Sequence, residues 1–174
     1  HAVKGKKKTE KIISTENRSK VPFSVVEAYK NLRIHLVSKL EKMNGKVAVI
    51  SSANASEGKS TTSINLAITL SQLNKKVILI DADSRRATIH QKVKIENKMG
   101  RLDVINGDVE LKSAIVQYNP YMDILTAGSV FNNPTELFSS NAFERMITEL
   151  RGMYDYVIID TPPINLVSDA LVIA

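Results

Sequence analysis

The chain has 174 residues, of which 43% are hydrophobic, and it carries 24 Lys and Arg against 18 Asp and Glu, a formal net charge of +6. This length allows one domain with a real core but hardly two, and the composition is that of a globular protein rather than a disordered one. The chain has no cysteine, which excludes disulfides, thiolate catalysis and cysteine-ligated metals, and no apolar run approaches the roughly 20 residues that a membrane-spanning helix needs.

The first 22 residues form a basic segment with little hydrophobic pattern. Within it, seven Lys and Arg residues face only Glu10 and Glu16. We therefore expect residues 1–22 to be a flexible arm and residues 23–174 to be a single domain. The arm is either a solvated tail or a segment that contacts anionic lipid or an acidic partner. Nucleic acid is not an expected partner, because the rest of the chain is nearly balanced in charge and carries no aromatic–basic stacking pattern.

Apolar residues recur at helical spacing after Pro22, in the stretch FSVVEAYKNLRIHLVSKLEKM. This spacing predicts an amphipathic helix whose apolar face docks on the rest of the domain. The residues expected on that face are Val26, Tyr29, Leu32, Leu36 and Leu40. Glu27, Lys30 and Arg33 share another face at three-residue spacing, and that face is expected either to meet a neighbouring subunit or to stay solvated.

Short apolar runs alternate with helical patterns through the rest of the chain. The runs KVAVISS, KVILIDAD, MDILTAG and DYVIIDTPP predict four buried strands, the last stopped by Pro162 and Pro163. Helices are predicted between them in TTSINLAITLSQL, in residues 99–116 with a break near Gly107, and in NPTELFSSNAFERMITELRGM. This alternation predicts an α/β fold, a mostly parallel sheet flanked by helices in three layers. Four strands are few for this architecture and another helix is starting at Ala174, so we expect further C-terminal strands.

The segment ANASEGKSTT, from Ala53 to Thr62, follows the first predicted strand and has the pattern of a phosphate-binding loop. Backbone N–H groups of such a loop and of the following helix start point into one concavity. In this pattern Lys59 reaches the β- and γ-phosphates, Ser60 is a Mg²⁺ ligand, and Gly58 lets the backbone pass close to the phosphate. Ala53 stands where a first glycine is expected, and alanine suffices if φ is not positive there. The residues expected to bind the nucleotide are Ala55, Ser56, Glu57, Gly58, Lys59, Ser60 and Thr61.

Three aspartates lie at the ends of predicted strands. Asp81 and Asp83 close ILIDAD, and Asp160 closes VIID. In an open parallel sheet, ligands bind outside the carboxyl ends of the strands, so the three carboxylates are expected near the triphosphate, where a divalent cation needs oxygen ligands. A single aspartate after a strand is more often a helix cap. Three of them beside a phosphate loop favour a functional group.

The trio ASEGKSTT, VILIDADSRR and YVIIDTPP resembles the Walker A, Walker A′ and Walker B motifs of the bacterial tyrosine kinases (BY-kinases) of capsule and exopolysaccharide synthesis, which are deviant P-loop ATPases. The resemblance covers most of the chain from about Val25 onwards, and EAYKNLRIHL is similar to the family's N-terminal helix, whose Glu-x-x-Arg-x-x-Arg pattern helps subunits form a ring. It implies a P-loop NTPase-like, Rossmann-like fold. The departures are Ala55-Ser56 in place of the usual Pro-Gly, Lys30 in place of an arginine, and tyrosines that form no terminal cluster.

The resemblance implies transfer of the γ-phosphoryl group of ATP to a tyrosine hydroxyl, with Mg²⁺ present. Lys59 and the loop amides would hold the phosphates, and Ser60 would bind Mg²⁺ directly. Asp83 and Asp160 would bind it directly or through water. The carboxylate that accepts or orients the tyrosine proton is expected to be Asp81, with Asp83 as the rival. The predicted catalytic residues are therefore Lys59, Asp81 and Asp83, and the predicted metal ligands are Ser60, Asp83 and Asp160.

The same resemblance implies partners: a membrane-protein activator whose cytoplasmic tail completes the site, protein tyrosine substrates, and further copies of the chain. It implies a cytoplasmic protein recruited to the inner face of the membrane. Arg85 and Arg86 belong either to a solvated turn or to a contact with phosphate or a neighbouring subunit. Two other functions stay open, a nucleotide-binding scaffold without kinase activity and a ParA/MinD-like ATPase switch. Asn54 argues against the switch, because those ATPases have a lysine there.

Overall fold

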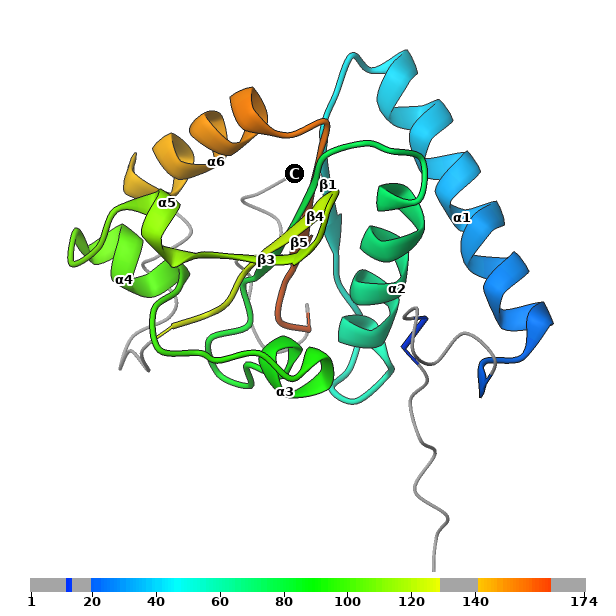
Figure 1. The fold of residues 1–174 in the computed structure, drawn as a ribbon, viewed down its shortest axis with the longest axis horizontal. Coiled ribbons are helices and arrows are strands. Elements are labelled where there is room, and N and C mark those ends of the chain that lie inside the picture. Colours follow the sequence, from blue (N-terminus) through cyan, green and yellow to red (C-terminus); the bar gives the residue numbers. More distant parts are fainter. Residues whose placement is uncertain (1–11, 14–19, 129–140, 164–174) are drawn as a thin grey trace, which may run out of the picture.

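The computed structural model describes residues 12–13, 20–128 and 141–163, which form one sheet with helices on both faces (Figure 1). The strands are β1 (Val47–Ile50), β2 (Val77–Asp81), β3 (Ile115–Asn119), β4 (Met122–Leu125) and β5 (Tyr156–Asp160). The helices in these ranges are α1 (Phe23–Lys42), α2 (Lys59–Ser71), α3 (Ile89–Val93), α4 (Arg101–Asn106), α5 (Leu111–Ala114) and α6 (Asn141–Met153). The strand order is β1-β5-β2-β4-β3, and all neighbours are parallel except β3 and β4. The prediction of a mostly parallel α/β sheet is confirmed.

The hydrophobic core lies in two clusters, one on each face of the sheet. On one face α2 packs against β2 and β5, and α1 covers α2 from outside. On the other face lie α4, α5 and α6 (Figure 1). Every residue of β2 and β5 is buried, as expected for the continuous apolar runs of strands that are covered on both sides. The predicted three layers are present, and α1 adds an outer element on the α2 side.

The apolar face of α1 differs in part from the prediction. Val26 and Leu40 are buried, and Tyr29 and Leu36 are partly buried against the core. Leu32 is 42% exposed, so its prediction as a docking residue is wrong. At 3.6 residues per turn, position 32 falls at the edge of the stripe that Tyr29, Leu36 and Leu40 define, and it turns away from α2.

The charged residues of α1 make contacts within the chain. Lys30 Nζ lies 2.7 Å from Glu27 Oε1 in an i,i+3 pair. Arg33 donates from Nη1 to the carbonyl oxygen of Thr69 in α2 at 2.7 Å, so it takes part in the α1–α2 contact. The expectation of one charged face available to a neighbouring subunit is therefore wrong for Arg33, which lies closer to the buried stripe than Glu27 and Lys30 do.

Two elements were not predicted, α3 and the edge strand β3. The helical pattern expected over residues 99–116 ends at Ala114, and the chain continues directly as β3, which pairs with β4. No residue of β3 is fully buried, so the strand lacks the continuous apolar run that marks the central strands. The turn back to β4 is closed locally, because the Tyr121 N–H donates to Asn119 Oδ1 at 2.9 Å.

A short piece of the predicted basic arm contacts the core. Ile13 is 1% exposed, and its N–H donates to Asn65 Oδ1 of α2 at 2.8 Å. Ile12 packs against the same cluster. The arm is therefore attached at this point, which its basic composition did not indicate. The remaining arm up to residue 19, residues 129–140 and residues 164–174 lie outside the described part, so α6 is the described portion of the helices predicted over 133–153.

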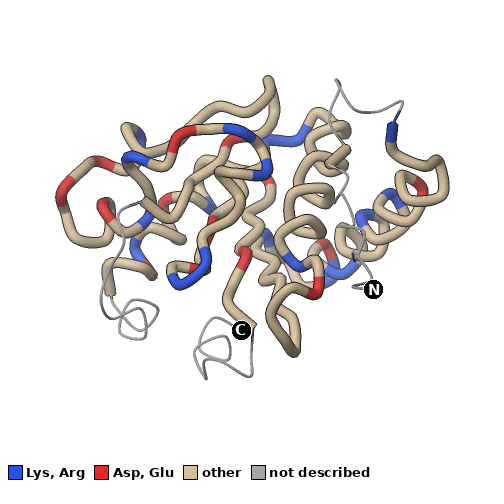
Figure 2. Tube along the Cα trace, turned by 90° about the horizontal axis from the view of Figure 1, so that it is seen from below, with Lys and Arg blue, Asp and Glu red and all other residues tan. Residues whose placement is uncertain are grey.

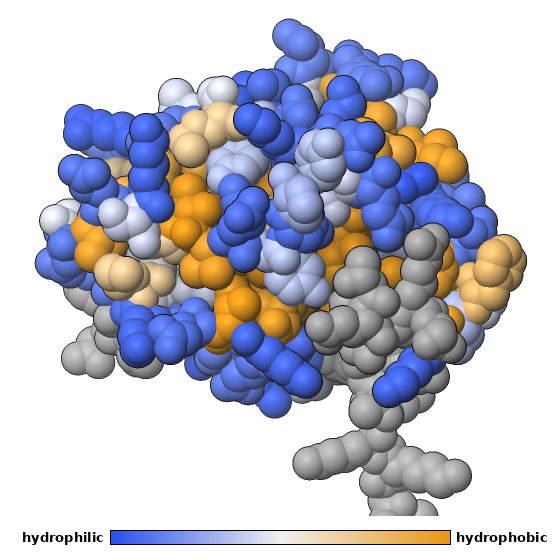
Figure 3. All heavy atoms as spheres, in the orientation of Figure 1, coloured by the Kyte–Doolittle hydropathy of each residue, from blue (hydrophilic) through white to orange (hydrophobic). Residues whose placement is uncertain are grey.

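Charged and apolar residues are spread over the surface. Figure 2 shows Lys and Arg, and Asp and Glu, distributed along the whole described chain. On the face shown in Figure 3, apolar side chains are interspersed with hydrophilic ones. The most exposed large apolar side chains are Phe23 and Met43, at the two ends of α1. Within the described ranges, no helix has both the length and the apolar character needed to span a bilayer.

Candidate functional site

The loop between β1 and α2 ends in a left-handed turn that starts α2. Gly58 caps the helix with a φ of 84°, a conformation that glycine adopts without steric cost. Ser56 is also left-handed, with a φ of 66°; for a residue with a Cβ this costs about 1–2 kcal/mol. Ala53 is not among the residues with positive φ. Alanine is therefore accepted at the position where a first glycine was expected.

A cavity of about 160 Å³ opens beside this loop, at the carboxyl ends of the parallel strands. Its lining residues come from the loop and α2, from the segment after β2, and from the segment after β5: Ala55, Ser56, Gly58, Lys59, Ser60, Thr61, Asp83, Arg85, Arg86, Thr88, Lys92, Pro162 and Pro163. The predicted nucleotide contacts all line it except Glu57. Glu57 is exposed, and its carboxylate accepts a hydrogen bond from Asn54 Nδ2 at 2.9 Å, which lowers the pKa of Glu57.

Asp160 is the centre of a buried hydrogen-bond group; it does not line the cavity itself, but it contacts Lys59 and Ser60, which do. Lys59 Nζ lies 2.9 Å from Asp160 Oδ1, and Ser63 Oγ donates to the same oxygen at 2.8 Å. Ser60 Oγ donates to Asp160 Oδ2 at 2.7 Å. Asp160 is fully buried, and the Lys59 side chain is only 7% exposed. The lysine and serine of the loop are therefore held against the aspartate of β5, and Ser63 is an additional donor that was not predicted.

Asp81 and Asp83 occupy different environments. Asp83 lines the cavity, and its Oδ2 lies 3.8 Å from Lys59 Nζ. Asp81 is fully buried and does not line the cavity, and its carboxylate accepts the backbone N–H groups of Asp83 at 3.2 Å and Ile89 at 3.3 Å. Burial, and secondly the negative charge of neighbouring Asp160, raise the pKa of Asp81 to about 7. We expected Asp81, rather than Asp83, to accept or orient the tyrosine proton, but only Asp83 lines the cavity. Asp81 is the last residue of a strand that is covered on both sides.

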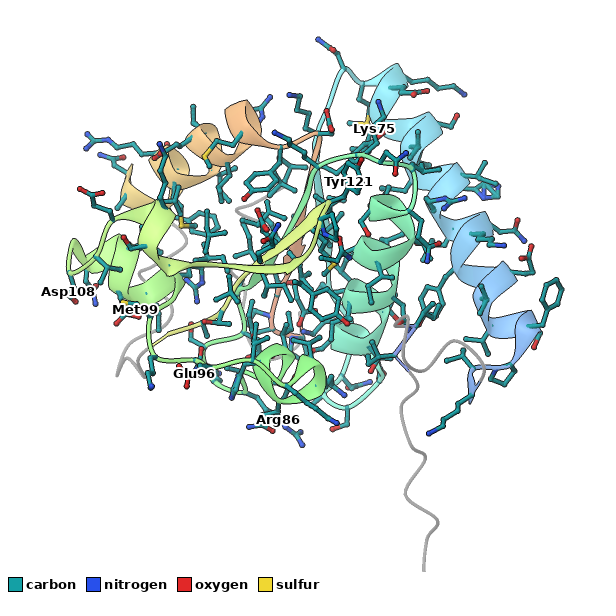
Figure 4. The ribbon with its side chains drawn as sticks, in the orientation of Figure 1. Lys75, Arg86, Glu96, Met99, Asp108 and Tyr121 are labelled. Atoms are coloured by element: carbon teal, nitrogen blue, oxygen red, sulfur yellow. The ribbon has the colours of Figure 1, made fainter. Side chains whose placement is uncertain are left out.

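The cavity wall that follows β2 is basic. Arg85, Arg86 and Lys92 line it, and Figure 4 shows Arg86 at the end of the sheet where α3 lies. Arg86 Nη1 donates to Ser56 Oγ at 3.0 Å, so the segment after β2 is tied to the phosphate loop. Burial lowers the pKa of Lys92, while the charge of Asp160 acts in the opposite direction. The two arginines whose role was left open therefore lie at the cavity. Lys92 was not predicted, since a lysine in a short helix carries no sequence signal.

Arg101 is a further residue that the sequence did not single out. It is fully buried at the start of α4, and Nε donates to the carbonyl oxygen of Asp81 at 3.2 Å. Its Nη2 donates to Ser84 Oγ. Burial lowers the pKa of Arg101 to about 10, and the charges of Asp81 and Asp83 oppose that shift. Arg101 therefore keeps its charge at neutral pH beside the strand end that carries both aspartates.

Of the histidines that the structure describes, neither His35 nor His90 lines the cavity. His35 is exposed, and its Nδ1 lies 3.0 Å from the carbonyl oxygen of Asn31 within α1. His90 is absent from the cavity lining, and its Nδ1 is buried without a hydrogen-bond partner.

A family model described as an AAA domain matches residues 45–174. Among curated proteins, the chain is 38% identical over 148 residues to the tyrosine-protein kinase YwqD of Bacillus subtilis (strain 168). The match covers 84% of this chain and 62% of YwqD, so the chain spans less than two thirds of that relative's length.

Solved structures agree with this relationship. The kinase domain of the Escherichia coli tyrosine kinase ETK matches with a TM-score of 0.81 and 34% identity, over 85% of this chain and 58% of that one. The chimerical protein CapA2B2 matches with a TM-score of 0.80 and 30% identity, over 94% of this chain and 70% of that one. The segments that resemble the Walker A, A′ and B motifs meet at the cavity. By its sequence and by its fold, this chain belongs to the bacterial tyrosine kinase family of P-loop ATPases.

Proposed function

We propose that this chain is the ATP-binding domain of an autophosphorylating protein-tyrosine kinase that regulates capsule or exopolysaccharide polymerisation and export. The observation that carries the proposal is the joint contact with Asp160 of Lys59 and Ser60, two residues of the phosphate-loop segment that line the cavity. The names of the relatives, tyrosine-protein kinases, support the same reaction.

The residues around the cavity are suited to hold a triphosphate. Lys59 Nζ is in contact with Asp160 and 3.8 Å from Asp83, at a place from which it can turn toward the β- and γ-phosphates. The start of α2 lines the same cavity, and a helix N-terminus attracts phosphate. Arg85 and Arg86 add positive charge at the wall. Phosphoryl transfer depends mainly on such positioning and charge neutralisation.

The oxygen donors at this site fit Mg²⁺. Ser60, Asp83 and Asp160 offer hydroxyl and carboxylate oxygens, which hard cations prefer. Across the described residues, no group of three or more His, Cys, Asp or Glu side chains is arranged to hold a metal by itself. Mg²⁺ does not need one, because it is usually held by one or two carboxylates together with substrate phosphates and water. Held by these residues, Mg²⁺ would neutralise part of the charge of the phosphates.

We infer that Asp83, rather than Asp81, accepts the proton of the acceptor tyrosine. A proton acceptor must come within hydrogen-bond reach of the hydroxyl. Asp83 lines the cavity, whereas Asp81 is fully buried and does not line it. The N–H of Arg86 donates to Asp83 Oδ1 at 3.0 Å, which fixes the orientation of this carboxylate. Asp81 then supports the turn that carries Asp83.

The partners follow from the family resemblance and remain part of the proposal. They are a membrane-protein activator that completes the site through its cytoplasmic tail, tyrosine-bearing protein substrates, and neighbouring copies of the chain. The activator would bring a cytoplasmic kinase to the inner face of the membrane. A ring would use Glu27 and Lys30, which are partly exposed on α1, while Arg33 is committed to α2 in the single chain.

A ParA/MinD-like switch is the less supported alternative. The lysine expected at position 54 is Asn54, and its side chain amide donates to Glu57 within the same loop instead of carrying a charge toward a second subunit. The relatives YwqD and ETK are both named tyrosine kinases. A scaffold that binds nucleotide without transferring phosphate is a distinct outcome of the experiment.

The test is phosphoryl transfer from radiolabelled MgATP to the full chain and to a tyrosine peptide, with and without a potential activator tail peptide. We expect transfer by the wild type and its loss in Asp83→Asn, by about 10²-fold or more, while ADP binding measured by calorimetry largely survives. Lys112→Met, on the exposed side of α5, is the control for the preparation. ADP binding without transfer would indicate the scaffold, and ATP hydrolysis without transfer would indicate the switch.

A further inference from the structure

Arg101 is a buried cation that the nucleotide chemistry described above does not use. It is fully buried and does not line the cavity. Its guanidinium donates to the Asp81 carbonyl oxygen and to the Ser84 hydroxyl. It therefore contacts both ends of the turn 81–84, and Asp83 lies inside that turn.

Arg101 is the second cation of a buried charged group. The group contains the carboxylates of Asp81, Asp83 and Asp160, all at the ends of β2 and β5. Lys59 approaches from α2, while Arg101 approaches from α4 in the layer on the other face of the sheet (Figure 1). Buried carboxylates are costly unless they are paired. Bound phosphates would compete for the charge of Lys59, whereas Arg101 does not line the cavity and bonds to the Asp81 carbonyl oxygen and the Ser84 hydroxyl beside the carboxylates.

The position of Arg101 is set by β4 and not by the contents of the cavity. The Arg101 N–H donates to the Thr126 carbonyl oxygen at 2.8 Å. The preceding residue, Gly100, packs so closely that a Cβ there would lie 2.4 Å from that same oxygen and 2.4 Å from the backbone nitrogen of Gly128. The start of α4 is thus pressed against the chain that leaves β4. A residue held in this way can act as a fixed support for the neighbouring turn.

We propose that Arg101 is a positioning residue that keeps Asp83 directed into the cavity while Lys59 turns to the phosphates. This inference rests on the proposed kinase function. Because Arg101 reaches the turn 81–84 and not the cavity, it acts on the rate of transfer after binding. It contributes little to the affinity for nucleotide.

The test compares Arg101→Met, which removes the charge, with Arg101→Lys, which keeps the charge and loses the planar fork. Arg145→Met, on the exposed side of α6, is the matched control. We expect kcat for peptide phosphorylation to fall by about 10²-fold in Arg101→Met, the scale of a small misplacement at a reacting centre. KM for ATP and the Kd for ADP should change by less than about threefold, and Arg101→Lys should recover part of kcat.

Hydrogen exchange gives a second readout that does not need kinase activity. The amides of Asp83, Arg86 and Ile89 are bonded to the two carboxylates. We expect them to exchange faster in Arg101→Met than in Arg145→Met, with α1 unchanged. If Arg101→Met does not fold, Ser84→Ala, which removes one contact of Arg101, takes its place in both measurements.

The outcomes separate the two proposals. If the wild type transfers no phosphoryl group, the proposed function fails, and faster exchange in the turn would still support the positioning role. If the wild type is active and Arg101→Met keeps its kcat, the positioning role is overturned. It is also overturned if exchange in the turn is unchanged, or if Arg101→Met and Arg101→Lys lose ADP binding and thermal stability together with activity, since Arg101 would then be a structural residue only.

Discussion

Arg86 joins the phosphate loop to the carboxylate that faces the cavity. Its Nη1 donates to Ser56 Oγ at 3.0 Å, and its backbone N–H donates to Asp83 Oδ1 at 3.0 Å. Ser56 is left-handed at a φ of 66°. A hydrogen bond of about 0.5–1.5 kcal/mol offsets part of the steric cost of that conformation. The loop therefore keeps a serine where the related sequences usually have glycine, with Arg86 as its local support.

At position 56 the glycine variant should be more stable than the alanine variant, which is the reverse of the usual order. At an ordinary site glycine is less stable than alanine by about 0.5–1 kcal/mol. In Ser56→Ala the strain stays and the Arg86 bond is lost, so we expect the free energy of unfolding to fall by about 1 kcal/mol. Ser56→Gly relieves the strain and should be the more stable of the two. Urea denaturation measures both.

Ser38, exposed in the middle of α1, is the control position for this comparison. There glycine should be the less stable residue by about 1 kcal/mol, as in any helix interior. The left-handed conformation of Ser56 would be contradicted if alanine were the more stable residue at both positions.

Lys59→Met should weaken nucleotide binding. A charge-assisted hydrogen bond to phosphate contributes about 1.5–3 kcal/mol, so we expect the Kd for MgATP to rise by about 10-fold to 100-fold. Ser60 and Ser63 still donate to Asp160, so the protein should stay folded. Calorimetry gives the affinity, with the exposed Lys112→Met as control. An unchanged Kd would remove the cavity from consideration as the phosphate site.

The buried carboxyl of Asp81 should make stability fall as pH rises. Its pKa is raised in the folded chain from 3.8 to about 7. The folded state therefore holds a proton that the unfolded state releases, and the stabilisation is full below about pH 4 and lost as pH rises toward 7. Across that window a shift of this size corresponds to on the order of 4 kcal/mol.

Urea denaturation of the nucleotide-free chain at pH 5 and pH 7.5 tests this expectation. The difference between wild type and Asp81→Asn isolates Asp81 from the other titrating groups. We expect the wild type to lose more stability than Asp81→Asn between the two pH values. If the free energy of unfolding changed by the same amount in both proteins between pH 5 and pH 7.5, Asp81 would be ionised in the folded chain at both pH values.

Reversing the charge at Lys30 should weaken any self-association through α1. The Glu27–Lys30 pair is partly exposed, and such pairs contribute only about 0.2–1 kcal/mol, so a ring built on them should depend on salt and concentration. Light scattering of the wild type and Lys30→Glu at low and high salt, with MgATP, measures the mass. A wild type that stays monomeric at low salt and high concentration would exclude the ring.

Arg33→Ala tests the contact between α1 and α2. Because Arg33 bonds the carbonyl oxygen of Thr69 within the chain, we expect this change to lower the free energy of unfolding by about 1 kcal/mol. Lys30→Ala should change it by less than about 0.5 kcal/mol. Urea denaturation compares the two variants. Equal effects would mean that the α1–α2 contact does not depend on Arg33.

The order of strands and helices, the phosphate loop and the aspartates at strand ends could be read from the sequence, because each is a local pattern. Four apolar runs form strands that pair in parallel, and the phosphate loop and Asp160 come together, with Lys59 and Ser60 in contact with that aspartate. The edge strand β3 was missed, since a half-exposed strand after a helical turn has no distinctive period. Leu32 was misplaced for a related reason, because spacing alone does not say where the edge of a packed stripe falls.

Tertiary structure alone decided which polar groups face the cavity. Asp81 and Asp83 are two residues apart and chemically alike, yet one ends a strand covered on both sides and the other lies in the turn beyond it. Arg101 is 20 residues from Asp81 in sequence and reaches it only because α4 is pressed against the end of β4. Burial and hydrogen bonding between distant segments set these roles, and neither is encoded in the spacing of residues along the chain.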